Sequence, residues 1–130
     1  MLGISPDKVC FIIQKAREFH AKEEVVIPEE PSSPTDDWAL QVLADHANDP
    51  CYQEMKYLIE AMDEEEQVNL VALLWLGRGD YSADEWAAAL SEARSNLSNH
   101  TAEYVIGTPL VADYLEEGLY ELGYTCEEEG

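Results

Sequence analysis

The chain has 130 residues, 46% of them hydrophobic, which is enough for one well-filled core and too few for two. Its 28 acidic and 7 basic residues give a formal net charge of -21. This charge makes direct binding to nucleic acid or to an anionic membrane unfavourable, so any electrostatic partner should be a basic protein. A second interpretation stays open, in which the acidity serves solubility or reflects a salty host cytoplasm.

The N-terminal part is predicted to contain two helices joined by a proline-rich loop. Ser5-Pro6-Asp7 combines a capping serine, a proline at the first helical position and an acid at the positive end of the helix dipole. A helix should therefore begin here, and it should end near residue 23. Residues 25–36 hold three prolines, which cannot continue a helix, and are predicted to form a loop. A second helix is expected over residues 37–46.

Two further helix starts follow in the middle of the chain. Asp49-Pro50 repeats the pattern of a cap and a proline, and Asp63 with Glu66 forms a capping box. Beyond the second start, residues 70–76 are apolar on every side, which is typical of a helix buried at the centre of a domain. We therefore expect a buried central helix over about residues 66–76.

A corner with two glycines follows this central helix. Gly77 and Gly79 are both predicted to end it, because glycine enters the left-handed backbone region at little cost. Ser82 and Glu85 then form another capping box. This predicts a new helix that begins close to Trp86 and carries its apolar residues along one stripe.

The C-terminal part is predicted to contain a short turn of helix over residues 102–106 and a last helix from Thr108-Pro109 to Gly123. One face of the last helix is apolar, and the other carries a ladder of carboxylates without a cation in the same helix, namely Asp113, Glu116, Glu117 and Glu121. No segment alternates between apolar and polar residues as a strand would. The predicted fold class is all-α, a single-domain bundle of five to six helices.

The cysteines and the apolar runs bear on the compartment. Cys10, Cys51 and Cys126 are odd in number and lack the spacing of a disulfide framework, so they are predicted to be reduced thiols. The apolar run near the N-terminus is too short for a signal peptide, and no run approaches the roughly 18 residues that a spanning helix needs. We expect a cytoplasmic protein without membrane contact.

The segment of residues 70–86 suggests two familiar sites, and the residues argue against both. Aligning Glu85 with the last glutamate of a calcium-binding EF-hand loop places Leu74, Leu76 and Arg78 where the ion needs oxygen ligands, which excludes calcium. The Arg-Gly-Asp tripeptide is an extracellular adhesion signal, and the expected compartment argues against it. The histidines lack metal-site spacing and no catalytic or nucleotide motif is present, so we predict no catalytic residue, metal or cofactor.

Arg78 is the residue of main interest at the corner. Its planar guanidinium suits a bidentate carboxylate pair, and Arg78 and Arg94 are the cations of this part of the chain. We favour a structural clamp, for which the candidate partners are Asp80, Asp113, Glu116 and Glu117. The alternative is a site for an anion or a peptide carboxylate that uses the N–H groups at the next helix start and includes Trp75, Arg78, Asp80 and Trp86.

Two motifs resemble those of an uncharacterised family of small bacterial proteins, known as a domain of unknown function. They are WLGRGD at residues 75–80 and GTPLVADYLEEGL at residues 107–119. The resemblance implies a helical family core over residues 51–124, with residues 1–50 as a variable helical extension and residues 125–130 as a disordered acidic tail. It implies no reaction, cofactor or partner. Motifs of this length suggest that the corner packs against the start of the last helix.

Three functional interpretations remain at this point. The leading one is a non-enzymatic interaction or regulatory module that offers the acidic face of the last helix to a basic partner. The first alternative is a small-ligand or anion-binding protein, or an enzyme, with its site at the corner of residues 77–80. The second alternative is a mimic of DNA, whose carboxylates occupy phosphate-like positions on a DNA-binding protein.

Overall fold

The computed structural model of the chain describes residues 2–21 and 48–126. The predicted loop at residues 25–36, the predicted second helix at residues 37–46 and the last four residues of the predicted tail lie outside these ranges.

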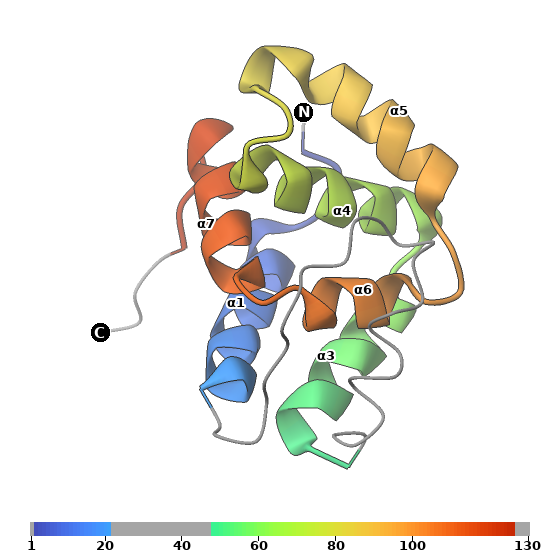
Figure 1. Cartoon of the computed structure of the whole chain (residues 1–130), viewed down its shortest axis with the longest axis vertical. Coiled ribbons are helices and arrows are strands. Elements are labelled where there is room, and N and C mark those ends of the chain that lie inside the picture. Colours follow the sequence, from blue (N-terminus) through green and yellow to red (C-terminus); the bar gives the residue numbers. More distant parts are fainter. Residues whose placement is uncertain (1, 22–47, 127–130) are drawn as a thin grey trace.

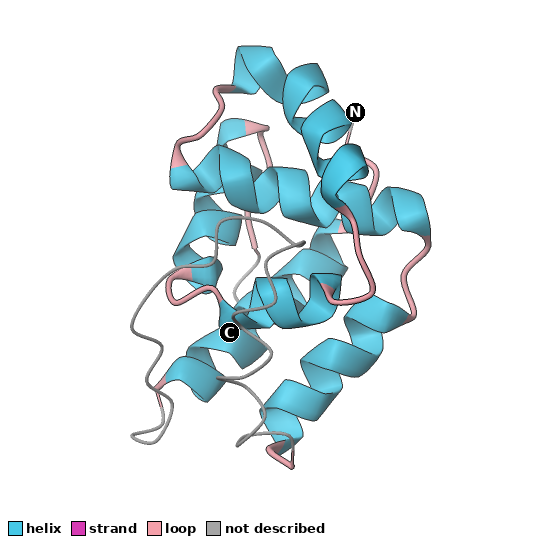
Figure 2. Cartoon of the chain, turned by 45° about the vertical axis from the view of Figure 1, so that its right-hand side comes forward, coloured by secondary structure: helices cyan, strands magenta, loops and turns pink. Residues whose placement is uncertain are grey.

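The described residues form helices and loops and contain no strand (Figure 2). Six α-helices are present, and a short 3-10 helix, η2, precedes one of them. Their bounds are α1 (Pro6–His20), α3 (Pro50–Glu60), α4 (Glu64–Arg78), η2 (Ala83–Glu85), α5 (Trp86–Asn96), α6 (Thr101–Gly107) and α7 (Val111–Glu121). The all-α prediction of five to six helices is confirmed.

The first three helices begin where their capping residues predict. The Ser5 hydroxyl accepts the N–H of the residue two positions on at 3.2 Å, and the Asp49 carboxylate accepts the corresponding N–H at 2.8 Å. At the start of α4, Asp63 accepts the N–H of Glu66 at 2.8 Å, and the Glu66 carboxylate accepts the N–H of Asp63 at 3.1 Å. These contacts satisfy N–H groups that a helix start leaves without a backbone partner.

The helix α4 is the centre of the fold, as its uniformly apolar sequence predicts. Every residue from position 68 to position 76 is buried. In Figure 1, α4 crosses the middle of the molecule with α5 above it and α6 below it, and it packs against both α5 and α7. The helix α1 joins the same core through its contacts with α3 and α7. A helix surrounded in this way needs no polar face, which explains its composition.

The prediction that Gly77 ends the central helix is wrong, and only Gly79 does so. The helix continues through Gly77 to Arg78 and ends at Gly79, whose φ of 98° lies in the left-handed region. Gly77 serves close packing, since a Cβ atom there would lie 1.7 Å from the backbone oxygen of Tyr114 in α7. Gly118 of α7 likewise allows α4 to approach closely, since a Cβ atom there would lie 2.5 Å from the backbone oxygen of Leu73. The two motifs therefore meet backbone to backbone.

The start of the last helix also differs from the prediction. The hydroxyl of Thr108 donates to the carbonyl oxygen of Tyr104 at 2.9 Å, so Thr108 completes the end of α6. The helix α7 begins three residues later at Val111. Gly123, with a φ of 92°, follows the end of α7, as expected for a glycine that closes a helix.

The cysteine prediction is wrong for two of the three residues. Cys10 in α1 and Cys126 form a disulfide across a sequence separation of 116 residues. Local spacing could not reveal this pair, because only the packing of the whole chain brings its end against α1. Residues 125 and 126 lie within the described ranges, and the disulfide holds Cys126, so the predicted disordered tail does not begin at residue 125. Cys51 is not part of a disulfide, and its thiol donates to the Glu18 carboxylate at 3.4 Å.

The disulfide removes the reduced-thiol argument for the cytoplasm. Within residues 2–21 and 48–126, no helix is both long enough and apolar enough to span a bilayer.

Candidate functional site

At the corner after α4, the guanidinium of Arg78 is held by its own chain. One terminal nitrogen of Arg78 lies 2.7 Å from the Oδ2 atom of Asp80, and the Nε–H donates to the same oxygen at 2.9 Å. The Arg78 side chain is only 16% exposed, whereas that of Asp80 is 44% exposed. Of the candidate partners, Asp80 is therefore the one that the structure places on Arg78. This geometry agrees with the structural clamp.

A buried polar network extends inward from this ion pair. The indole N–H of Trp75 donates to the hydroxyl of Tyr104 at 2.7 Å, and both residues are buried. The Arg78 guanidinium also lies near the Tyr104 hydroxyl and interacts with it electrostatically. Burial raises the pKa of Tyr104, and the neighbouring Arg78 only partly offsets this, so the hydroxyl stays neutral at physiological pH. On the outside, the ring of Tyr81 stacks on Trp75 with 6.3 Å between centroids.

Trp86, the remaining residue of the predicted corner site, and Arg94, the second cation of this part of the chain, lie elsewhere. Trp86 is 6% exposed at the start of α5 and belongs to the core, and its indole N–H has no hydrogen-bond partner in the described part of the chain. One terminal nitrogen of Arg94 lies 3.0 and 2.9 Å from the two carboxylate oxygens of Glu65 at the start of α4. The corner residues thus do not converge on one open site.

The acidic face of α7 has a cation that the sequence analysis missed. Arg17 of α1 lies 2.8 Å from a Glu116 oxygen and 3.3 Å from an Asp113 oxygen. No local pattern in the sequence marks Arg17, because the pairing depends on α1 lying beside α7 (Figure 1). The three side chains are between 48% and 67% exposed, so the pairs contribute little stability, about 0–1 kcal/mol.

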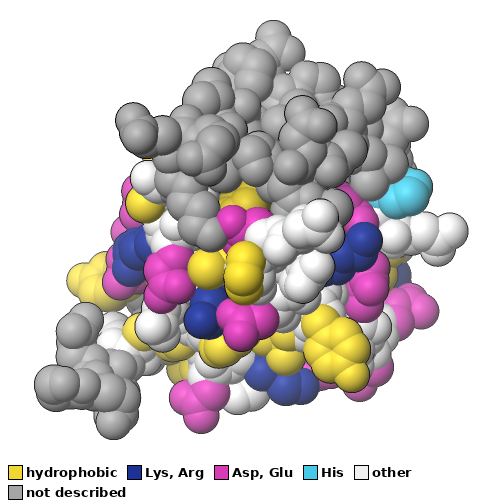
Figure 3. Space-filling view, turned by 90° about the horizontal axis from the view of Figure 1, so that it is seen from below, with side chains coloured by type: hydrophobic (Ala, Val, Ile, Leu, Met, Phe, Trp, Pro, Cys, Tyr) yellow, Lys and Arg dark blue, Asp and Glu magenta, His cyan; other side chains and the backbone are white. Residues whose placement is uncertain are grey.

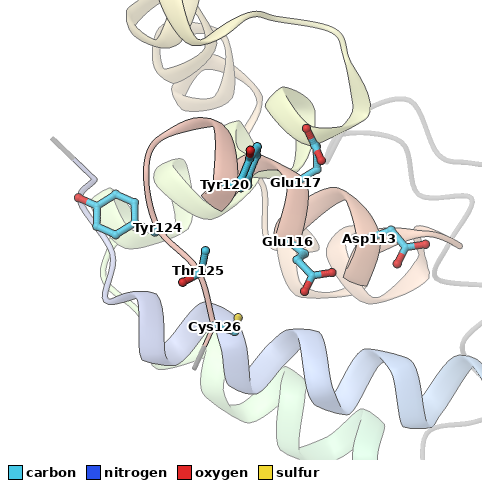
Figure 4. A pocket seen from close by; sticks show the side chains of 7 residues that line it. All are labelled: Asp113, Glu116, Glu117, Tyr120, Tyr124, Thr125 and Cys126. Atoms are coloured by element: carbon cyan, nitrogen blue, oxygen red, sulfur yellow. The ribbon is translucent and has the colours of Figure 1, made fainter. Parts of the chain in front are cut away.

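The same face of α7 borders a hollow of about 480 Å³, which we call the acidic groove. It is lined by Asp113, Glu116, Glu117, Tyr120, Tyr124, Thr125 and Cys126. Figure 4 shows one wall formed by α7 and the other by the chain after α7, which runs down towards α1. The second wall ends at the disulfide to Cys10. Tyr120 is 68% exposed, which is unusual for a large aromatic side chain and leaves its ring available for contact.

The charge in and beside the acidic groove is not balanced from within the described structure. Each of the six described Lys and Arg residues lies in an ion pair, and these residues are Lys8, Lys15, Arg17, Lys56, Arg78 and Arg94. In Figure 3, most basic side chains on the displayed face lie next to acidic ones. No ion pair within residues 2–21 and 48–126 involves Glu117 or Glu121. Partial burial and the neighbouring Glu117 raise the pKa of Glu121, as expected for carboxylates one turn apart.

A second, smaller hollow of about 290 Å³ lies between α1 and the start of α7. Its lining includes Arg17, His20, Leu110 and Asp113. The Nε2–H group of His20 donates to the carbonyl oxygen of Ile106 at 2.8 Å, since a carbonyl can only accept. Burial lowers the pKa of His20, and this hydrogen bond only partly offsets the effect.

The histidine predicts a pH dependence of stability. The folded chain binds a proton on His20 less readily than the unfolded chain does. The contribution of neutral His20 to the free energy of unfolding is therefore complete above pH 6.5, the usual pKa of histidine, and is lost as the pH falls below that value. Chemical denaturation between pH 8 and pH 5, both about one to two units from that value, should show this loss. His20→Gln should flatten this part of the profile, and His100→Gln, at an exposed residue, should keep it. Parallel profiles for the wild type and His20→Gln would contradict the assignment.

No three His, Cys, Asp or Glu side chains within the described ranges lie together as a metal site would require. The described residues thus form a small helical domain with a closed corner and an acidic groove lined by carboxylates and tyrosines.

Residues 52–124 match the model of the family DUF3775, whose description is a protein of unknown function, and the chain belongs to this family. No curated protein and no solved structure matches the chain.

The match covers the helices that form the corner and the α7 wall of the acidic groove. It confirms the family resemblance that the two motifs suggest. Arg17 and both disulfide cysteines, Cys10 and Cys126, lie outside the matched residues. The second wall of the acidic groove is therefore built partly from residues outside the matched range.

Proposed function

We propose that the protein is a non-enzymatic binding module whose acidic groove receives a basic segment of a partner protein. The observation that carries this proposal is the combination of three carboxylates and two tyrosines around one hollow, with every described cation engaged in an ion pair. A guanidinium or ammonium group is the complement of such a surface. It can pair with Glu117 and lie against the ring of Tyr120.

The size of the acidic groove supports a short segment as the occupant. Its volume of about 480 Å³ falls in the range of about 300–1,000 Å³ that holds small ligands. A few side chains of an extended peptide therefore fit, and a whole helix does not. A cation–π contact at an exposed site contributes about 0.5–1 kcal/mol. Charge pairs at exposed sites are screened by salt, so the peptide should bind with moderate affinity that falls as the ionic strength rises.

The alternative site at the corner receives less support. Arg78 would have to leave Asp80 and the Tyr104 hydroxyl to bind an anion, and neither hollow is lined by a corner residue. We also keep the cytoplasm as the proposed location, where a disulfide is usually transient rather than structural.

The test is the affinity of the oxidised chain for an arginine-containing peptide, measured by fluorescence anisotropy at low and at physiological ionic strength. The double variant Glu117→Gln with Glu121→Gln removes two carboxylates of α7 that lie in no described ion pair. It should weaken binding about tenfold, which corresponds to about 1.4 kcal/mol. The reason is the loss of direct charge pairing in and beside the acidic groove.

The matched control is Glu60→Gln with Glu64→Gln, which removes the same charge from two exposed residues that do not line the acidic groove. It should bind like the wild type. Equal weakening in both double variants would show that only the overall charge matters. Unchanged binding in the α7 variant would rule out the acidic groove as the binding site.

A further inference from the structure

The disulfide connects two parts of the chain that already pack without it. The helices α1 and α7 are in contact, and both contribute fully buried side chains to one core, among them Val9, Ile12, Val111, Leu115 and Leu119. Arg17 adds ion pairs across the same boundary. The covalent link is therefore not required to hold α7 on α1.

What the disulfide does hold is the short segment after α7. Backbone hydrogen bonds fix this segment only at its beginning, where Gly123 N–H donates to Tyr120 at 3.0 Å and Tyr124 N–H donates to Leu119 at 2.8 Å. No described hydrogen bond or ion pair involves Thr125, which is exposed. Beyond Tyr124, the disulfide at Cys126 is thus the main anchor of the second wall of the acidic groove.

The charge around this wall works against its position. The wall lies across from the part of α7 that carries Glu116, as Figure 4 shows, and Glu117 lines the same hollow. In the sequence, Cys126 is followed directly by three glutamates. Like charges repel, so an untethered segment of this composition is driven away from α7. The covalent bond opposes this repulsion.

From these observations we propose that the Cys10–Cys126 disulfide is a redox switch that builds the acidic groove when oxidised and dismantles it when reduced. Its consequence for binding rests on the proposed function, whereas the release of the segment does not. Both half-cystines are partly exposed, so a thiol can reach them.

The reductant is a dithiol. One of its thiolates attacks a sulfur of the disulfide to form a mixed disulfide and releases one protein thiolate, which takes up a proton. The second thiol of the reductant, as its thiolate, then displaces the other protein sulfur, which is also protonated. In total two electrons and two protons pass to the protein, giving two cysteine thiols and one oxidised dithiol.

The first readout is structural and uses the full chain, oxidised or treated with dithiothreitol. Amide hydrogen exchange, followed by NMR, should accelerate about tenfold or more at Gly123 and Tyr124 on reduction, because their N–H groups hold the start of the segment and local opening then costs less free energy. Amides of α4 should keep their rates. Equal rates at Gly123 and Tyr124 in both states would overturn the proposal.

The second readout is the affinity for the arginine-containing peptide in the two states. Reduction should weaken binding about tenfold, and the double variant Cys10→Ser with Cys126→Ser should behave like the reduced chain whether or not dithiothreitol is present. Cys51→Ser is the matched control and should respond to dithiothreitol like the wild type, since Cys51 is not in the disulfide.

The two readouts separate the two proposals. Faster exchange with unchanged peptide affinity would overturn the control of binding and leave the binding function in place. Faster exchange with no peptide binding in either state would contradict the binding function and leave the release of the segment standing. If the peptide affinity of the Cys51→Ser variant did not change with dithiothreitol, the redox effect would depend on Cys51 rather than on the disulfide, and the proposed switch would be overturned.

Discussion

Replacing Gly77 with alanine should destabilise the protein by about 3–5 kcal/mol or prevent it from folding. The added Cβ atom would lie 1.7 Å from the backbone oxygen of Tyr114, and a backbone atom cannot move aside as a side chain can. In an ordinary helix the same change stabilises by about 0.5–1 kcal/mol. The sign of the effect, measured by urea denaturation, therefore reports directly on the contact between α4 and α7.

Two other glycines provide a graded comparison. Gly118→Ala places its Cβ atom 2.5 Å from the Leu73 oxygen, so its cost should be smaller than that of Gly77→Ala. Gly79→Ala meets no atom within 4 Å and carries only the strain of its φ of 98°, about 1–2 kcal/mol. If Gly77→Ala were as stable as the wild type, the close approach of the two helices would be disproved, even if the other variants behaved as expected.

Replacing Tyr104 with phenylalanine should cost about 2–3 kcal/mol of unfolding free energy. The ring still fits the core, but the Trp75 indole N–H, which donates to the hydroxyl at 2.7 Å, loses its partner in a buried position. The Arg78 guanidinium loses a neighbouring polar group as well. Removing one partner of a buried hydrogen bond costs more than the bond itself contributes, because the remaining group stays desolvated.

A double-mutant cycle isolates this contact. Trp75→Phe combined with Tyr104→Phe should cost clearly less than the sum of the two single changes, because the second change removes the stranded group. Tyr57→Phe, at a side chain that is 80% exposed, should stay within about 0.5 kcal/mol of the wild type. Strict additivity in the cycle would contradict the network that holds Arg78 at the corner.

The family match and the disulfide together divide the molecule into two parts with different roles. The segment of residues 52–124 supplies the central helix, the closed corner and the acidic wall of the acidic groove. Outside the matched range, α1 supplies Arg17, which pairs with part of that wall, and the Cys10–Cys126 disulfide anchors the opposite wall. In our proposals, the matched segment carries most of the binding chemistry, and the residues outside the match set how much of it is available.

The helix starts show how far local information reaches. Ser5, Asp49 and Asp63 each bond to N–H groups two or three residues further on, so their effect is contained in a few adjacent positions of the chain. The all-apolar run of residues 70–76 likewise predicts its own burial, because a helix with this sequence has no polar face to expose to solvent. These signals depend on neighbours in the chain, and they predicted the all-helical class, three helix starts and the central helix.

The candidate site was accessible to sequence analysis only in part. The carboxylates of α7 are recognisable from their spacing of three and four residues, which places them on one face of a helix. The partner of Arg78 was one of several acids, and distance in the chain did not rank them. Residues 124–126 carry no local signal as a wall of the acidic groove, since their position depends on a partner in α1.

Sequence by itself thus determined the helical class, the capping residues, the buried central helix and the acidic face of the last one, because each arises from contacts within a few residues. Only the tertiary structure decided that Gly77 is a contact point rather than a helix end, that Arg17 faces Asp113 and Glu116, and that Cys10 bonds to Cys126. The physical reason is the same in all three cases. Each joins residues more than 30 positions apart, and which of them meet is set by how the helices pack.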